Sequence, residues 1–162
     1  MPVTRPRLRF AYGHPARFVA LGLGIGLVPA APGTIGTLAA VPLYLGLTRL
    51  LATEFFLALW CALFLVGIWA CELTGRHLGA HDHRAMVWDE IVAFVLVLFF
   101  TPQHPLWQAI AFALFRVFDV LKPAPIRSVE RALPNGLGVM LDDLIAAFYT
   151  LLCMAAWKLV FG

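Results

Sequence analysis

Long apolar stretches separated by short polar connections constrain the fold of this chain more than any other feature. Five of them cover residues 35–51, 55–71, 91–100, 106–118 and 144–160. Leu, Phe and Ala dominate these stretches, which favours helices over strands. A helix needs about 20 residues, with a working range of ~17 to 25, to cross the hydrocarbon core of a bilayer. The second and last stretches reach that length, and the first is borderline.

The composition supports a membrane protein. Hydrophobic residues make up 62% of the chain and charged residues 13%, whereas a soluble domain is about half apolar and about a quarter charged. The basic residues behind the net charge of +3 are scattered, which argues against nucleic-acid binding. Cys61, Cys71 and Cys153 have no metal-ligand spacing and are predicted to be small buried hydrophobic residues. We expect no cleavable signal peptide.

The third and fourth stretches are short, and the segment between them contains Pro102 and Pro105. Because prolines end helices, these stretches predict a tight helical hairpin. A start near Ala85 would lengthen the third helix enough to cross most of a bilayer at about 1.5 Å per residue. We therefore expect an all-α, multi-helix integral membrane protein with about four membrane-spanning helices and additional short helices. One domain covers residues 1–162, with a basic N-terminal segment at 1–17.

The distribution of basic residues orients this arrangement. With the N-terminus inside, ten of the twelve basic residues lie on the cytoplasmic side, in agreement with the positive-inside rule. These ten are Arg5, Arg7, Arg9, Arg17, Arg76, Arg84, Arg116, Lys122, Arg127 and Arg131, which leaves Arg49 and Lys158 outside. Every acid except Glu54 falls on the cytoplasmic side as well. We expect an active site there, built from the N-terminal region and the connections 72–90 and 116–143.

Six of the nine acidic residues are gathered in short clusters within this apolar chain. They are Asp82, Asp89, Glu90, Asp119, Asp142 and Asp143. A carboxylate near a membrane is costly unless it is paired, bound to a metal or open to water. Asp89 with Glu90 and Asp142 with Asp143 are adjacent pairs, and each pair opens a predicted helix. Interaction with the helix dipole alone would stabilise such a pair by only about 0.3 to 1 kcal/mol. Two such pairs together with Asp119 predict a shared site for a hard divalent cation.

Basic residues accompany these acids. Arg116, Asp119 and Lys122 follow one another at three-residue steps, so they lie along one side of a predicted helix. This spacing fits a structural ion pair, and it equally fits a metal-binding carboxylate beside two phosphate-binding cations. The turn that follows contains Pro123 and Pro125 and would bring Arg127 close as a third cation.

Three further motifs allow a structural or a functional interpretation. The segment 29–37 predicts a helix entrance capped by Thr34 or Thr37, and the same backbone amides and hydroxyls would form a phosphate cradle. The tripeptide at 81–83 is a solvated loop or a transition-metal site, and we assign no role to its histidines. Glu72 is a weaker site candidate, because it can pair with Arg76 one turn later.

Taken together, these motifs resemble the phosphatidylglycerophosphatase A family of bacterial membrane phosphatases. The matching segments run in the family's order from about Phe18 onward. They are PGTIGT at 32–37, HDH at 81–83 with VWDE at 87–90, FRVFD at 115–119 with KPAPIR at 122–127, and GLGVMLDD at 136–143. Ala124 departs from the family, which often has an aromatic residue at this position.

The resemblance implies magnesium-dependent hydrolysis of phosphatidylglycerophosphate to phosphatidylglycerol and inorganic phosphate at the cytoplasmic face of the inner membrane. The expected Mg²⁺ ligands are Asp89, Glu90, Asp119, Asp142 and Asp143, with Asp82 as a further catalytic acid. Phosphate oxygens would be bound by Thr34, Thr37, Arg116, Lys122 and Arg127 while water attacks in line.

Two other classes of protein remain open at this point. A divalent-cation or proton transporter would also carry acids beside membrane helices, and a structural subunit would use them only as caps and ion-pair partners. The expected partners are phosphatidylglycerophosphate and other membrane lipids. Homo-oligomer formation, the number of metal ions and the identity of any nucleophile are left open.

Overall fold

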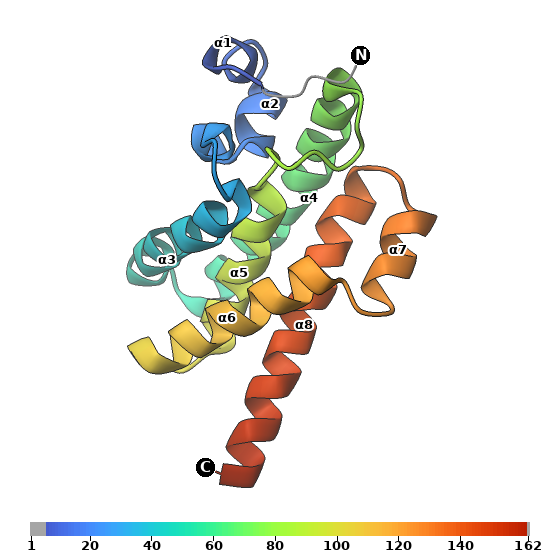
Figure 1. Cartoon of the computed structure of the whole chain (residues 1–162). Helices are drawn as coiled ribbons and strands as arrows, with labels where there is room; N and C mark the ends of the chain where they lie inside the picture. Colours follow the sequence, from blue (N-terminus) through green and yellow to red (C-terminus); the bar gives the residue numbers. More distant parts are fainter. Residues whose placement is uncertain (1–5, 162) are drawn as a thin grey trace.

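The computed structural model describes residues 6–161, and within this range every regular element is a helix. Figure 1 shows their arrangement. The elements are α1 (Leu8–Ala11), α2 (Pro15–Ala20), the 3-10 helix η1 (Gly22–Leu27), α3 (Pro32–Leu50), α4 (Thr53–Leu78), α5 (Trp88–Phe100), α6 (Pro105–Leu121), α7 (Ile126–Ala132) and α8 (Gly136–Phe161). The all-α prediction is therefore confirmed for the described part of the chain.

Helices α4 and α8 are the two described helices that are long and apolar enough to cross a membrane. Small residues allow them to approach closely: a Cβ at Gly67 would collide with Met140, and one at Gly136 would collide with the backbone carbonyl of Ile68. Large apolar side chains such as Leu65 and Leu152 remain exposed on their outer faces. This is consistent with a membrane-associated protein, whereas four spans remain a prediction.

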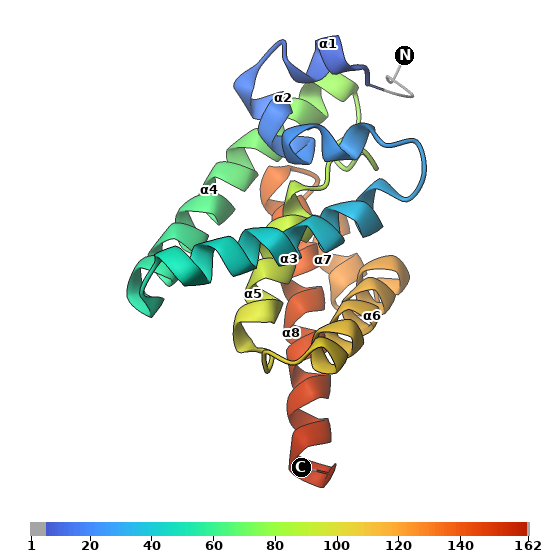
Figure 2. The same ribbon diagram turned by 90° about the vertical axis from the view of Figure 1, so that its left-hand side faces the viewer.

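Helix α5 lies at the centre of the molecule, packed against α3, α4, α6 and α8 (Figures 1 and 2). Residues 91–98 are all buried. The indole nitrogens of Trp60 and Trp88 fasten α4 to α5 by donating to the carbonyls of Val92 and Leu63, respectively. The expected start near Ala85 is wrong, because the helix begins at Trp88 and has 13 residues. At about 1.5 Å per residue it is too short to cross a bilayer.

The predicted hairpin at Pro102 and Pro105 is confirmed. Helix α5 ends at Phe100, and α6 begins at Pro105 after a four-residue connection in which His104 caps the new helix through its side chain. Figure 1 shows α6 running obliquely to α8 instead of parallel to it. Its C-terminal end thereby approaches the N-terminal halves of α5 and α8.

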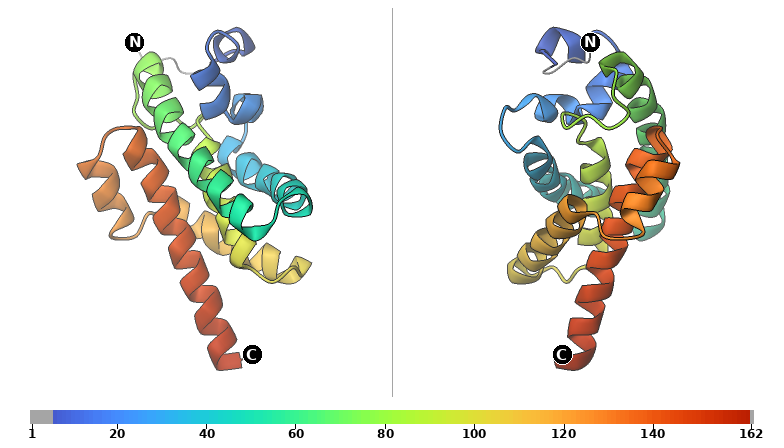
Figure 3. Two further views of the ribbon diagram at one scale, coloured as in Figure 1. Left: turned by 180° about the vertical axis from the view of Figure 1, so that it is seen from behind. Right: turned by 45° about the vertical axis from the view of Figure 1, so that its right-hand side comes forward.

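The short N-terminal helices lie at the same end of the molecule as the connection between α4 and α5, whereas the C-terminus of α8 projects at the opposite end (Figures 1 and 3). Arg17 stacks its guanidinium over Phe10 and donates to His77, which ties α2 to the end of α4. Five of the predicted cytoplasmic cations belong to these segments, namely Arg7, Arg9, Arg17, Arg76 and Arg84, while Arg5 lies outside the described residues. Cytoplasmic orientation itself remains a prediction.

The prediction for the cysteines is correct only in part. Cys71 is buried where α4 faces the core, but Cys61 and Cys153 are exposed on the outer faces of α4 and α8. An apolar stretch that faces lipid on one side exposes small hydrophobic residues as readily as it buries them, so sequence position alone did not separate the two cases.

Candidate functional site

Acidic residues that are far apart in sequence meet where the first turn of α5, the end of α6 and the second turn of α8 come together. Asp89 and Glu90 come from α5, Asp119 from α6, and Asp142 and Asp143 from α8. Each of these carboxylates interacts electrostatically with at least one carboxylate from another element. The sequence-predicted acids therefore form one polar centre inside an apolar bundle.

One half of this centre is built around Arg116. Its Nη1 atom donates to Glu90 Oε1 at 3.0 Å, to Asp119 Oδ2 and to Thr37 Oγ1 at 3.5 Å. We call these four residues the arginine group. The i to i+3 spacing of Arg116 and Asp119 on α6 brings their side chains together, as the sequence predicted. The two side chains and that of Glu90 are each less than one-fifth exposed.

The other half is built around Lys122. Its ammonium contacts Asp142 Oδ2 at 2.6 Å, Glu130 Oε1 at 3.2 Å and Asp82 Oδ2 at 3.4 Å. We call these four residues the lysine group. Oxygen atoms of the three acids lie within 4.8 Å of one another, a spacing that also suits a metal ion. Lys122 is therefore directed to different acids from Arg116, although the sequence places both along one helix.

The backbone explains this separation. Helix α6 ends at Leu121, and Lys122 adopts the left-handed conformation with φ 44° and ψ 60°. A non-glycine residue rarely occupies this region, and such strain is concentrated at functional sites. The chain turns there toward Pro123, so the lysine leaves the line of the helix and reaches the loop acid Asp82 and α7.

Helix α8 joins the two groups through consecutive residues. Asp142 belongs to the lysine group, whereas Asp143 interacts with Asp119 of the arginine group. The backbone amide of Asp143 donates to Asp142 Oδ1 at 2.9 Å, which fixes the orientation of that carboxylate. The two groups are thus contiguous parts of one site.

Several buried oxygens in this centre have no hydrogen-bond partner among the described residues. They are Asp89 Oδ1, Glu90 Oε2 and Asp143 Oδ2. Buried polar atoms are normally paired, so three unpaired carboxylate oxygens in one centre are available to bind a ligand. Carboxylate oxygens are the ligands that hard cations such as Mg²⁺ prefer, so the residues present fit a divalent cation.

The electrostatics of the centre lead to the same conclusion. Burial, followed by repulsion from Glu90, raises the pKa of Asp89 well above its usual range. Burial and the neighbouring Asp119 raise the pKa of Glu90 to about 8, despite the opposing effect of Arg116. Burial also raises the pKa of Asp119. A bound cation would reverse these shifts, because it stabilises the ionised carboxylates.

Helix α3 reaches the site through its first two turns. A Cβ at Gly33 would collide with the Glu90 carboxylate, and one at Gly36 would lie 3.3 Å from Glu90 Oε2. These glycines let an acid lie against the helix N-terminus, where the dipole favours negative charge. Capping by Thr34 or Thr37 is wrong: Pro32 opens the helix without a side-chain cap, and the Thr37 hydroxyl donates back to the carbonyl of Gly33.

The remaining candidates divide between structure and surface. Glu72 pairs with Arg76 at 2.6 Å and accepts a hydrogen bond from the backbone amide of Gly136, so it holds the start of α8 against α4. Arg127 is exposed and donates to the carbonyl of Leu121. It borders a surface pocket with His81 and with Glu130 of the lysine group, and it forms an ion pair with no described member of either group.

Glu130 is the acid that sequence reasoning missed. It lies on α7, between the Lys122 motif and the Asp142 pair, and it faces Lys122 only because the chain turns back after α6. A signal was available, since Glu130 is an acid on the connection already expected to form the site. Its helix is short and polar, however, and gave no apolar pattern that could fix its direction.

Fold and site together define a helical protein with two apolar helices of membrane-spanning length and a buried centre of carboxylates and cations. The chain belongs to the phosphatidylglycerophosphatase A family, whose profile matches residues 18–158.

Three curated relatives are similar over most of the chain. A phosphatidylglycerophosphatase A from Haemophilus influenzae is 42% identical over 158 residues, covering 96% of both chains. A protein of the same name from Escherichia coli K12 is 36% identical, covering 89% of this chain and 83% of its own length. A relative from Bacteroides thetaiotaomicron, provisionally named a phosphatidylinositol-3-phosphatase, is 36% identical and covers 89% of this chain and 94% of its own. No solved structure matches the chain significantly.

Proposed function

We propose that this protein hydrolyses phosphatidylglycerophosphate to phosphatidylglycerol and inorganic phosphate with Mg²⁺ as cofactor, at the cytoplasmic face of a bacterial inner membrane. The observation that carries this proposal is the convergence of buried, unpaired carboxylate oxygens with two cations in one centre. The names of the relatives from Haemophilus influenzae and Escherichia coli give the substrate.

The carboxylates are assigned to the cation. Glu90 and Asp119 belong to the arginine group, Asp89 and Asp143 lie beside them, and Asp142 extends this acidic lining toward Lys122. When bound, Mg²⁺ neutralises the charge of the phosphate and of the oxygens around it, which is the main requirement of phosphoryl transfer. Asp82 and Glu130 close the outer side of the site.

The cations are assigned to the substrate phosphate. Lys122 lies at the more exposed side, where its ammonium can exchange a carboxylate partner for a phosphate oxygen. Arg116 is held by Glu90 and Asp119, so its guanidinium presents a fixed donor fork to the centre. Thr34 on the first turn of α3 supplies a neutral donor, and Thr37 can do so only by giving up its hydrogen bond to the carbonyl of Gly33. Arg127 at the rim attracts the anionic headgroup from outside.

Water supplies the oxygen that forms the new bond to phosphorus, and the lipid alcohol leaves with a proton. A single turnover in water labelled with oxygen-18 should place the label in the released phosphate. Trapping of an aspartyl phosphate by borohydride would instead show that one of the acids attacks first.

The decisive experiment measures phosphate release from phosphatidylglycerophosphate in mixed micelles by the purified protein, with Mg²⁺ and with excess chelator. We expect turnover with Mg²⁺ and loss of turnover with chelator. Phosphatidylinositol 3-phosphate serves as the second substrate, because one relative is named for it. A faster reaction with that lipid would overturn the assigned substrate, and no release from either would favour an ion pathway or a structural subunit.

A further inference from the structure

A large apolar cavity lies at the end of the molecule opposite the acids. It has a volume of about 900 Å³ and is lined by the C-terminal part of α8, the α5–α6 connection and the middle of α3. Asp89 opens α5 and Thr101 follows its last turn, so about 18 Å of helix separates the acids from this cavity. The cavity is therefore independent of the candidate active site.

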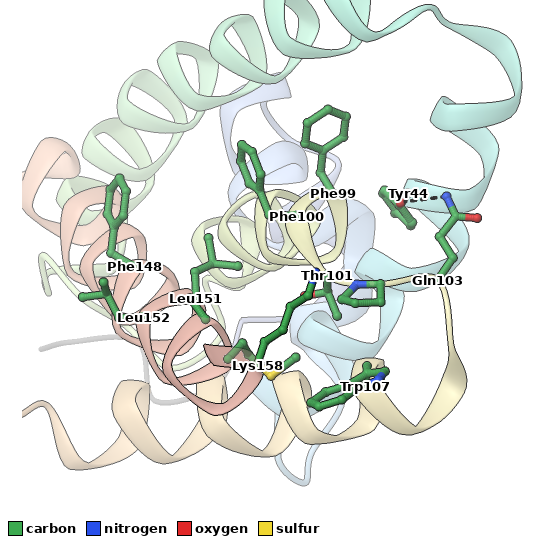
Figure 4. A pocket seen from close by; sticks show the side chains of 13 residues that line it. Tyr44, Phe99, Phe100, Thr101, Gln103, Trp107, Phe148, Leu151, Leu152 and Lys158 are labelled. Atoms are coloured by element: carbon green, nitrogen blue, oxygen red, sulfur yellow. Dashed lines mark hydrogen bonds between the residues drawn. The ribbon is translucent and has the colours of Figure 1, made fainter. Parts of the chain in front are cut away.

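The walls of the cavity are apolar and aromatic. Figure 4 shows Phe99 and Phe100 on one side, Leu151 and Leu152 on another, and Trp107 below them. Ligand pockets of about 300 to 1,000 Å³ with such walls typically bury an apolar ligand and orient it through a few polar groups. The cavity opens beside exposed apolar residues of α8, so a hydrocarbon chain can enter from the side.

Lys158 is the one charged residue among the described residues that line the cavity. Gln103 Nε2 donates to Tyr44 Oη at 3.3 Å, and the Thr101 hydroxyl donates to the carbonyl of Val97, so these groups are mutually occupied or turned toward the backbone. Lys158 extends across the cavity toward Thr101 (Figure 4). No acid lines the cavity, and Lys158 makes no hydrogen bond or ion pair with the described residues.

A cation that pairs with none of the described residues and lies beside an apolar cavity is complementary to an anionic amphiphile. We propose that this cavity binds one acyl chain of an anionic phospholipid, whose headgroup phosphate pairs with Lys158. The apolar walls accommodate the acyl chain, and the charged hydrogen bond at the rim of the cavity selects the headgroup. A zwitterionic lipid such as phosphatidylcholine carries a phosphate whose charge its own trimethylammonium group compensates, so it attracts Lys158 less than a lipid with a net negative charge. A soluble anion would leave the cavity unfilled.

Photolabelling tests this proposal in vesicles of phosphatidylcholine. A trace amount of a probe lipid is added to these vesicles, either phosphatidylglycerol or phosphatidylcholine, each with the same diazirine-bearing acyl chain. The residues that the probe labels are mapped by mass spectrometry. We expect phosphatidylglycerol to label residues around Trp107 and Leu151 roughly tenfold more than phosphatidylcholine does, the ratio typical of one charged hydrogen bond. Lys158→Gln should bring this ratio close to one. Arg49→Gln, which removes a cation outside the cavity, is the matched control and should leave the ratio unchanged.

A second variant separates occupation of the cavity from general contact with lipid. Ala155 lines the cavity and is exposed, so Ala155→Trp should fill the space without disturbing the core, and labelling by both lipids should fall. Equal labelling of outward-facing positions such as Leu65, or an unchanged ratio in Lys158→Gln, would overturn the proposal. Chemical crosslinking in the same vesicles gives one further outcome that would overturn the proposal. Glu54 is the acid expected on the same side of the membrane as Lys158, so crosslinked dimers that disappear in Glu54→Gln would identify a second copy of this chain as the occupant.

Discussion

The arginine group and the lysine group use the same device, one cation among three oxygen-bearing side chains, in different surroundings. The arginine group lies among α3, α5 and α6, and its charged side chains are 13% to 19% exposed. The lysine group includes Asp82 from a loop and Glu130 from short α7, which are 32% and 27% exposed. Helices fix the first group, whereas the second can rearrange, so we interpret the first as the base of the site and the second as its entrance.

Asp143→Asn should produce the largest effect, because Asp143 links the two groups. Asparagine keeps the shape but removes a charge that Asp119, Asp89 and Asp142 repel. We expect the phosphatase rate to fall at least about 10²- to 10³-fold, as on loss of one electrostatic contact to a transition state. The thermal unfolding temperature should stay equal or rise, because a buried repulsion is relieved. A loss of activity that accompanies unfolding would contradict this assignment.

Lys122→Met should separate the roles of the two groups. Loss of the ammonium should lower the rate on phosphatidylglycerophosphate by roughly 10²-fold if it binds the phosphate. It should also strengthen Mn²⁺ binding in calorimetry, because Asp82, Glu130 and Asp142 would lose their internal cation. Lys122→Gly provides the control for the backbone, since glycine accepts the left-handed conformation. Normal activity in Lys122→Gly would show that the ammonium has no role in substrate binding.

Gly33→Ala tests how rigid the base of the site is. The added methyl group would displace Glu90 from the first turn of α3. We expect about a tenfold fall in kcat, the scale of a small misplacement in a positioned site. Gly46→Ala on the same helix is the matched control, because its Cβ would meet no atom within 4 Å. An equal fall in both variants would mean that α3 itself is sensitive to substitution.

The pH dependence of stability gives the smallest effect. Without metal, the pKa of Glu90 rises from 4.5 to about 8, so the folded state binds more protons than the unfolded state in this interval. Thermal unfolding temperature in chelator should therefore fall by a few degrees as pH rises from about 5 to about 8. Added Mg²⁺ should flatten the curve, and so should Glu90→Gln. A rise in unfolding temperature over the same interval would contradict the assignment.

Sequence reasoning predicted the composition of the site better than its layout. The acids were recognisable because a charge in an apolar chain is rare. Asp89 lies in the first turn of α5 as predicted, whereas the predicted place of Asp142 at the start of the last helix is wrong, because α8 begins at Gly136 and Asp142 lies in its second turn. Pairing of Arg116 with Asp119 followed from helical spacing. These predictions depend on local geometry, which short-range sequence determines.

Features that depend on distant contacts were not predicted. The division of the cations into two groups depends on the left-handed turn at Lys122, which a lysine rarely adopts. Recruitment of Glu130 depends on the direction of α7, which tertiary packing determines. Helix α5 is shorter than expected because the backbone of Val87 bonds to Ala20 in the N-terminal region instead of continuing the helix.

The short and largely buried helix α5 also has a consequence for how the protein is made. A segment of 13 residues that begins with two acids is too short to enter a bilayer independently as a stable spanning helix. Helices α4 and α8 meet the length requirement and can insert first. Because α8 follows α5 in the chain and packs against it, the surroundings of α5 are complete only after α8 has been synthesised. We therefore expect a chain truncated before α8 to be unable to form the site.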